Sequence, residues 1–173
     1  MIIRKSTLSD INALMTIFDE ARGTIAALGI NQWQDGYPNR EVIAEDIAHS
    51  RSYAVEIDGE VCGTFVIVDD GEITYDRIYD GHWLTGDENQ SYVAIHRVAI
   101  SVKRRGGGIS TAIINYANEY AKSLERESMR IDTHEGNVVM RRMLEKNGFT
   151  HCGTIYLQNG DSRVAYEKKT INI

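Results

Sequence analysis

The chain has 173 residues, of which 42% are apolar and 25% are charged, as is typical of a globular protein. This length can bury a core without disulfides or metal, and it predicts one domain over 1–173. The formal net charge of −6 argues against general binding to nucleic acid or to an anionic membrane. No stretch is long and apolar enough for a signal peptide or a membrane span, and only two cysteines occur, so we expect a cytoplasmic protein.

The first half of the chain predicts a strand, two helices and a β-hairpin. The strand is the opening MIIRK, and apolar residues at helical spacing predict a helix over 8–29. A second helix is expected over 40–50 after a loop rich in turn-forming residues. The β-rich run over 52–68 is interrupted by Asp58-Gly59, a dipeptide typical of two-residue hairpins. An antiparallel pair of strands is therefore expected early in the sheet.

The second half begins with residues 69–91, which have neither helical nor strand periodicity. A connection of this size inside a compact domain is more often functional than idle. The elements that follow are a strand over 92–100, a helix over 109–124, a strand over 128–134, a helix over 137–147, and two strands over 151–158 and 162–169. This order predicts an α/β (α+β) mixed sheet of about six to seven strands flanked by about four helices, with a right-handed parallel crossover in the β-α-β unit.

The segment VKRRGGGIST, residues 102–111, joins the strand over 92–100 to the next helix. Unpaired backbone N–H groups and the helix dipole favour an anion at a helix N-terminus. Glycine lets the backbone approach a phosphate closely, and Arg104 or Arg105 can add charge-assisted contacts. The segment has neither the P-loop spacing nor the dinucleotide-binding spacing. We therefore expect a phosphate-binding loop of a different kind.

The loop matches the six-residue pattern [R/Q]-x-x-G-x-[G/A] with a serine in the last position, where glycine or alanine is usual. The matching residues are Arg105, Gly106, Gly107, Gly108, Ile109 and Ser110. With this motif in that slot of the element order, the chain resembles the GNAT superfamily of acyl-CoA-dependent N-acyltransferases over nearly its whole length. The helix that opens at Asn137 and the following NGF, residues 147–149, belong to the resemblance.

The resemblance implies acetyl-CoA as the co-substrate and no metal. Residues 105–110 would hold the pyrophosphate, and the backbone of Val98 and Ile100 would pair with the pantetheine amides. The amide of Val98 or Ala99 would stabilise the oxyanion. Asn137 would contact the pantetheine arm, or it would only cap its helix; both roles can coexist.

Acyl transfer to an amine also needs a group that takes a proton from the amine. His96 is the first candidate, because it lies two residues before Val98 and its side chain titrates near neutral pH. His134 and Glu135, at the end of the next strand, are the second choice. A histidine satisfied by neighbours in the sheet is the alternative for His96.

The acid that protonates the leaving thiolate is where the chain departs from the family. Many members carry a tyrosine seven residues after the helix-opening asparagine, and here that residue is Leu144. Either the thiolate leaves unaided, or another group donates the proton. The groups considered are Tyr92, Tyr116, Tyr120, Tyr156 and Cys152, although a buried apolar role suits the cysteine better.

The resemblance places the acceptor between the loop after the first helix and residues 69–91. Trp33, Tyr37 and Trp83 are candidate substrate-binding residues, unless these loops are simply solvated segments with packed aromatics. The interpretation is an N-acetyltransferase for a primary amine of a small molecule, peptide or protein, which reacts by direct attack in a ternary complex. The alternative is a non-catalytic acyl-CoA-binding sensor or interaction module, as Leu144 suggests. Nucleic acid and membrane partners are not expected, and a homodimer is left open.

Overall fold

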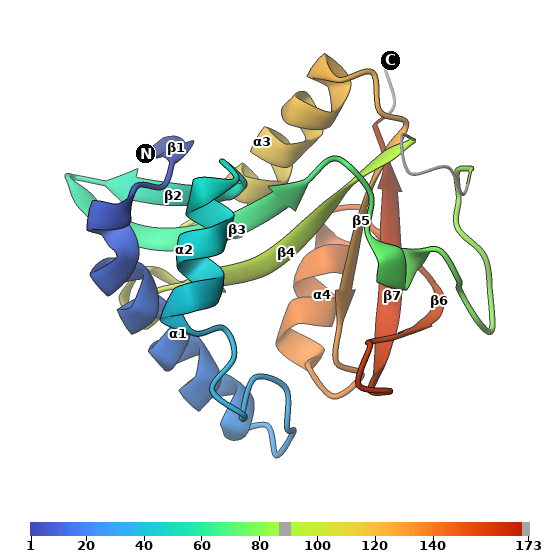
Figure 1. The fold of residues 1–173 in the computed structure, drawn as a ribbon, viewed down its shortest axis with the longest axis horizontal. Helices are drawn as coiled ribbons and strands as arrows, with labels where there is room; N and C mark the ends of the chain where they lie inside the picture. Colours follow the sequence, from blue (N-terminus) through green and yellow to red (C-terminus); the bar gives the residue numbers. More distant parts are fainter. Residues whose placement is uncertain (87–90, 171–173) are drawn as a thin grey trace. The chain divides into compact units, whose positions relative to one another are not determined.

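The computed structural model describes residues 1–86 and 91–170. Within these ranges it has four α-helices and seven strands, in the sheet order β1-β2-β3-β4-β5-β7-β6 (Figure 1). The predicted mixed α/β fold is confirmed. The chain divides into two compact units. The first unit is 1–67 with 97–113, and the second consists of the described residues of 68–96 and 114–173. The single domain stays a prediction.

The first unit contains an antiparallel sheet and two helices. Strand β1 (Ile2–Lys5) pairs with β2 (Ser52–Ile57), and β2 pairs with β3 (Glu60–Val68). The turn between β2 and β3 is the expected one, since Asp58 and Gly59 both have positive φ, at 54° and 80°. The start of β3 lies beside the glycine loop, because the Cys62 carbonyl accepts a hydrogen bond from the Ser101 amide.

Helices α1 (Ile11–Ala26) and α2 (Arg40–Ala48) lie side by side in this unit (Figure 1). Helix α1 ends three residues before the predicted limit, and the chain turns at Gly29, whose φ is 74°. The predicted apolar spacing is realised, because its buried side chains recur every three or four residues. One buried apolar cluster of the unit consists of Leu14, Ile17, Phe18, Ala21, Ile43 and Ala99.

The second unit is built on four strands. Strand β4 (Tyr92–Ile100) pairs in parallel with β5 (Ser128–Thr133), as predicted for the crossover through α3 (Ile109–Ser123). Strand β7 (Ser162–Lys169) is antiparallel to both β5 and β6 (Thr150–Tyr156). Helix α4 (Val138–Lys146) packs next to β6. Both β4 and α3 run from one unit into the other.

The described part of the aperiodic segment 69–91 belongs to the second unit and contacts strand β6. It has one 3₁₀ turn, η2 (Ile73–Tyr75), and Tyr79 forms a two-bond antiparallel bridge with Thr154 on β6, with both N–O distances at 2.8 Å. The backbones approach so closely that a Cβ atom on Gly81 would lie 1.9 Å from the carbonyl oxygen of Cys152. The segment therefore covers the outer edge of β6, which protects an otherwise open strand. Residues 87–90 lie outside the described ranges.

Candidate active site

The glycine loop follows β4 in the first unit and leads through a 3₁₀ turn, η3 (Val102–Arg104), into α3. Gly106 and Gly108 have φ of 78° and 77°, a conformation that side-chain-bearing residues adopt only with strain. Residues 105–108 are exposed, whereas Ile109 is buried. Alternating backbone conformations of this kind turn successive N–H groups toward one point and form an anion-binding concavity. Binding of a pyrophosphate by this loop stays a prediction.

Other residues of the first unit hold the ends of the loop through hydrogen bonds and packing. Ser101 donates its backbone N–H to Cys62 at 2.9 Å, and Val102 donates to the Glu20 carboxylate at 2.8 Å. The Arg105 guanidinium donates to the Thr24 hydroxyl at 2.8 Å. A Cβ on Gly63 would lie 3.3 Å from the Ile109 side chain, so the start of α3 is packed on β3. These contacts anchor the loop ends and leave its middle exposed.

The backbone of β4 is irregular beside the residues predicted to bind the co-substrate. Arg97 has φ of 52°, which is uncommon for a residue with a side chain and marks a local strain. Among the described residues of the second unit, the pairing of β4 with β5 ends at Ala94 and Arg130, before His96. Ala99 is buried in the core of the first unit, while Val98 and Ile100 are partly exposed. Strand β3 is the neighbour of β4 on its other side, so an external amide could pair with β4 only where no pairing with β5 is described.

The second unit contains a carboxylate–imidazole pair. His96 Nε2 lies 3.0 Å from Glu72 Oε2, and both side chains are largely buried. The Nε2 atom is fully buried, and the contact is an ion-pair approach whose angle falls outside ideal hydrogen-bond geometry. The ring of Tyr75 is 5.9 Å from the imidazole, and its hydroxyl donates to Asp132 Oδ2 at 2.7 Å. Two carboxyl groups and a tyrosine therefore surround the predicted base.

The ionisation of this cluster follows from its surroundings. Burial opposes the charge on Glu72, but the contact with His96 and the hydrogen bonds from Thr74 prevail and lower the pKa of Glu72 to about 2. Asp132 keeps some exposure as a residue, yet the desolvation of its carboxyl group raises its pKa. Burial raises the pKa of Tyr75 well above its ordinary value. Glu72 is thus a carboxylate at neutral pH, and Tyr75 is a neutral hydrogen-bond donor.

The second-choice bases have other contacts. His134 accepts a hydrogen bond at Nδ1 from the Gly136 amide at 2.9 Å, which occupies that nitrogen. Glu135 is exposed at the end of β5. Asn137 caps α4, because its Oδ1 accepts the Met140 amide at 3.2 Å. The capping role expected for Asn137 is confirmed, and its contact with a pantetheine arm stays a prediction.

The predicted acceptor residues differ in their surroundings. In the first unit, Trp33 is half-buried with its ring 5.7 Å from that of Phe18, and Tyr37 is exposed with its hydroxyl accepting a hydrogen bond from Arg97. In the second unit, Trp83 is 5% exposed, donates from Nε1 to the Tyr75 carbonyl at 3.0 Å and covers the Arg130 guanidinium. Trp83 therefore has packing contacts, and its predicted contact with an acceptor stays a prediction.

The groups considered for the missing acid are mostly engaged elsewhere. Leu144 is fully buried, and burial raises the pKa of Cys152 to about 11. Tyr120 donates to Asp69 at 2.6 Å, and burial raises the pKa of Tyr92. Tyr116 is partly exposed on α3, and Tyr156 is exposed beside the Tyr79 ring. None of these contacts assigns the acid role.

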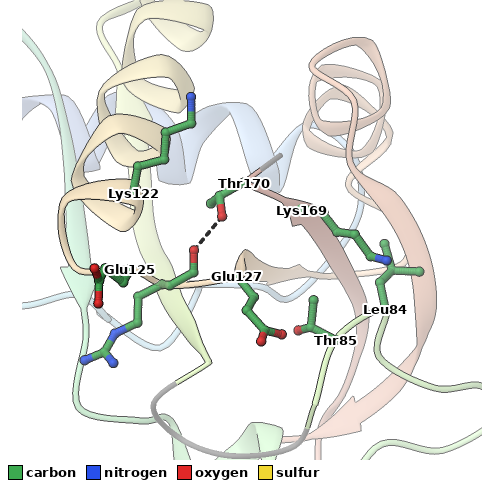
Figure 2. A pocket seen from close by; sticks show the side chains of 8 residues that line it. Leu84, Thr85, Lys122, Glu125, Glu127, Lys169 and Thr170 are labelled. Atoms are coloured by element: carbon green, nitrogen blue, oxygen red, sulfur yellow. Dashed lines mark hydrogen bonds between the residues drawn. The ribbon is translucent and has the colours of Figure 1, made fainter. Parts of the chain in front are cut away.

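The second unit contains a pocket whose lining includes no predicted site residue (Figure 2). Its lining comes from the segment before β4, the end of α3 and the outer ends of β5 and β7, and consists of Leu84, Thr85, Lys122, Glu125, Arg126, Glu127, Lys169 and Thr170. The Thr170 hydroxyl donates to the Arg126 carbonyl across one side (Figure 2). Because cations and carboxylates alternate around it and no predicted site residue lines it, we do not regard it as the active site.

Within 1–86 and 91–170, no group of three or more His, Cys, Asp or Glu side chains is placed to hold a metal ion. No helix in the same ranges has the length and apolar character needed to cross a membrane.

Comparison with known proteins gives one family. Residues 12–149 match the model of the acetyltransferase (GNAT) family. A GNAT-family acetyltransferase from Streptococcus agalactiae 2603 is 35% identical, with a TM-score of 0.87 over 99% of this chain and 96% of that chain. A putative acetyltransferase from Staphylococcus aureus Mu50 is 24% identical (TM-score 0.72; 99% and 100% covered). A ribosomal-protein-alanine N-acetyltransferase from Brucella melitensis is 19% identical (TM-score 0.66; 98% and 99% covered). A search of curated proteins gives no match.

Proposed function

Because the chain belongs to the GNAT acetyltransferase family, we propose that it transfers an acetyl group from acetyl-CoA to a primary amine. The acceptor would be a small molecule or a peptide or protein amine, and it would attack the thioester directly in a ternary complex. The observation that carries this proposal is the exposed glycine loop, in which Gly106 and Gly108 hold positive φ at the N-terminus of α3. Two buried free cysteines suit a reducing cytoplasm, where we expect the protein to act.

In this proposal, the loop binds the pyrophosphate of acetyl-CoA through the amides of residues 106–110. The start of α3 adds its dipole, and Arg105 adds a charge near the phosphates. The thioester supplies the activated acyl group. The backbone of Val98 to Ile100 orients the pantetheine arm, and an amide of Val98 or Ala99 stabilises the negative charge on the carbonyl oxygen in the transition state.

His96 takes the proton from the amine. An alkyl ammonium cannot attack a carbonyl, so a group that titrates near neutral pH must accept a proton before or during attack. The cluster around His96 is acidic, since Glu72 is ionised beside it. A negative local charge favours a cationic acceptor and supports an amine as the substrate.

The test combines turnover with binding. Purified protein is given acetyl-CoA and a panel of amines, and release of CoA thiol is recorded; amine-dependent release is the expected result. Calorimetry then compares CoA binding by Gly107→Glu and Gly107→Ala. A Cβ at this position meets only the Arg104 carbonyl at 3.2 Å, so the alanine variant controls for bulk while the glutamate adds a repelling charge. We expect Gly107→Glu to bind CoA at least about tenfold more weakly, which corresponds to 1.4 kcal/mol.

A second candidate function is a non-catalytic acyl-CoA sensor. The observation that favours it is the buried Leu144, which cannot donate a proton to a thiolate. This alternative predicts CoA binding that depends on residue 107 but no thiol release with any amine. The two functions therefore separate in the same pair of measurements.

A further inference from the structure

Glu72 is not among the site residues predicted from the sequence, yet its carboxylate contacts His96. The two residues are in the second unit, and Glu72 Oε2 lies 3.0 Å from His96 Nε2. Only 22% of the Glu72 side chain and 16% of the His96 side chain are exposed. At such burial an ionised carboxylate needs compensating partners, because desolvation of a charge is costly.

Hydrogen bonds hold the Glu72 carboxylate and the backbone that carries it. The backbone N–H and hydroxyl of Thr74 donate to its Oε1 at 3.2 and 3.0 Å. The backbone N–H of Glu72 itself donates to the Tyr92 hydroxyl at 3.0 Å. The next element, η2, is also fixed, because the Tyr75 hydroxyl donates to Asp132. Glu72 is therefore oriented by hydrogen bonds that do not involve His96.

The contact also decides which ring nitrogen can act as the base. Nε2 is buried and faces the carboxylate, so it carries a hydrogen when the ring is neutral. No hydrogen bond from another described residue occupies Nδ1. A neutral imidazole has one lone pair, and with the hydrogen on Nε2 that lone pair is on Nδ1. The geometry thus leaves Nδ1 as the nitrogen that can accept a proton.

We infer that Glu72 is a positioning residue that fixes the hydrogen on Nε2 of His96 and stabilises the imidazolium formed when Nδ1 takes a proton from the acceptor amine. This inference rests on the proposed acetyl transfer and deepens it by naming the group behind the base. The role is that of a buried carboxylate that orients a catalytic imidazole, which works without the carboxylate ever accepting the proton.

An N–H bond of the acceptor ammonium breaks, and its proton bonds to Nδ1 of His96. The freed electron pair forms the C–N bond with the thioester carbonyl carbon, and the C–S bond breaks as the tetrahedral intermediate collapses. The nitrogen gives up a second proton to become an amide. Of the two protons, one ends on the CoA sulfur and one is released to solvent, so His96 returns to its neutral form.

Several titratable groups surround the imidazole, and each must be considered in a pH experiment. Glu72 belongs to the segment before η2, Tyr75 to η2 itself, Tyr92 to β4 and Asp132 to β5. The two tyrosines are neutral at neutral pH because burial raises the pKa of each. Glu72 and Asp132 are the acidic groups, and only Glu72 is in direct contact with the ring.

The experiment uses the full chain and Glu72→Gln, which keeps the shape of the side chain and removes its charge. Glu41→Gln, an exposed position on α2, makes the same chemical change as a control. We expect kcat/KM of Glu72→Gln at neutral pH to fall at least about tenfold, a part of what a positioned base contributes. The acidic limb of the kcat/KM pH profile of this variant should move to lower pH. An imidazolium without the neighbouring carboxylate loses its proton more readily. CoA affinity and the control variant should be unchanged within about twofold.

A second readout does not depend on turnover. The His96 ring protons are assigned in the NMR spectrum by their loss in His96→Gln, and their titration is followed in wild type and in Glu72→Gln. We expect the titration of the ring to move to lower pH in Glu72→Gln, because the carboxylate that favours the imidazolium is gone. An unchanged midpoint, or an unchanged acidic limb in an active enzyme, overturns the inference. If no amine is acetylated at all, the proposed function fails, and the NMR titration alone decides whether Glu72 controls His96.

Discussion

Arg97 and Asp46 form a two-point ion pair, with Nε and Nη2 of the guanidinium donating to the two carboxylate oxygens at 2.8 and 2.7 Å. Arg97 also donates from Nη1 to the Tyr37 hydroxyl. The pair joins α2 to the strained residue of β4 within the first unit, and both side chains are largely buried. The ion pair therefore holds the irregular strand that leads to the predicted co-substrate backbone.

Asp46→Asn should destabilise the protein by roughly 3 kcal/mol, because it leaves a buried guanidinium without its counter-charge. Glu45→Gln, exposed on the same helix, is the control and should change stability by less than about 0.5 kcal/mol. Urea unfolding of the three proteins measures the difference. Equal midpoints for wild type and Asp46→Asn would mean that the pair adds nothing to stability.

Glu167 and Arg130 are a second buried pair, in the second unit, with side-chain exposures of 0% and 1%. The guanidinium lies between the rings of Trp83 and Tyr92, at 4.3 and 4.1 Å from their centres. Trp83→Ala should therefore lower stability by about 3–5 kcal/mol, the usual cost of removing a large buried side chain. Trp83→Phe, which keeps a ring over the cation, should cost less. A Trp83→Ala protein of normal stability with a raised acceptor KM would instead restore Trp83 as a substrate contact.

Asp10 predicts how stability changes in acid. Its hydrogen bonds with Arg4 outweigh its desolvation, and with the amide and hydroxyl of Thr7 they lower the pKa of Asp10 from 3.8 to about 2. A group whose pKa is lower in the folded state stabilises the protein above its unfolded pKa, and this contribution is lost as the pH falls toward the folded value. Arg4 is about one-third exposed, so solvent screening reduces the effect to roughly 1 kcal/mol.

The measurement is the free energy of unfolding of wild type and Asp10→Asn between pH 7 and pH 2. We expect the wild type to be more stable at pH 7 and the difference to shrink between about pH 4 and pH 2. A difference that is constant over this range would contradict an ionised Asp10 as its source.

The sequence predicted the elements well because their signals are local. The Asp58-Gly59 turn and the strand over 92–100 lie where predicted, since turn chemistry and apolar runs depend on neighbouring residues. The site was predicted less completely. Glu72 is a single acid in an aperiodic segment, and no pattern in the adjacent sequence identifies it as the partner of His96.

Trp83 illustrates the same limit from the other side. An aromatic residue in a polar, aperiodic segment suggests a surface that binds a ligand. In the structure, Trp83 is buried against the Arg130 guanidinium, which also stacks on Tyr92. No spacing of residues in the sequence predicts this arrangement. Contacts between residues far apart in the chain depend on tertiary packing, so local patterns cannot reveal them.

Leu144→Phe tests whether the position where many family members have tyrosine matters here. The leucine is fully buried, so the larger ring should cost about 1–3 kcal/mol through overpacking. Because neither side chain ionises, the alkaline limb of the pH profile should stay in place. A new or lost ionisation in this variant would show that the site is coupled to the acid that serves the thiolate.

The most direct test of the whole account is the rate of acetyl transfer by His96→Gln, with His96→Ala beside it, measured as CoA thiol release with an amine that the wild type accepts. His96→Gln keeps a polar side chain against Glu72 but has no useful basicity, so it separates packing from proton transfer. The account predicts that both variants lose about 10² or more in kcat while CoA affinity is nearly unchanged. It also predicts that the acidic limb of kcat/KM disappears or moves in both. Wild-type rates and an unchanged pH profile in both variants would contradict the account and move the search for the base to His134 and Glu135.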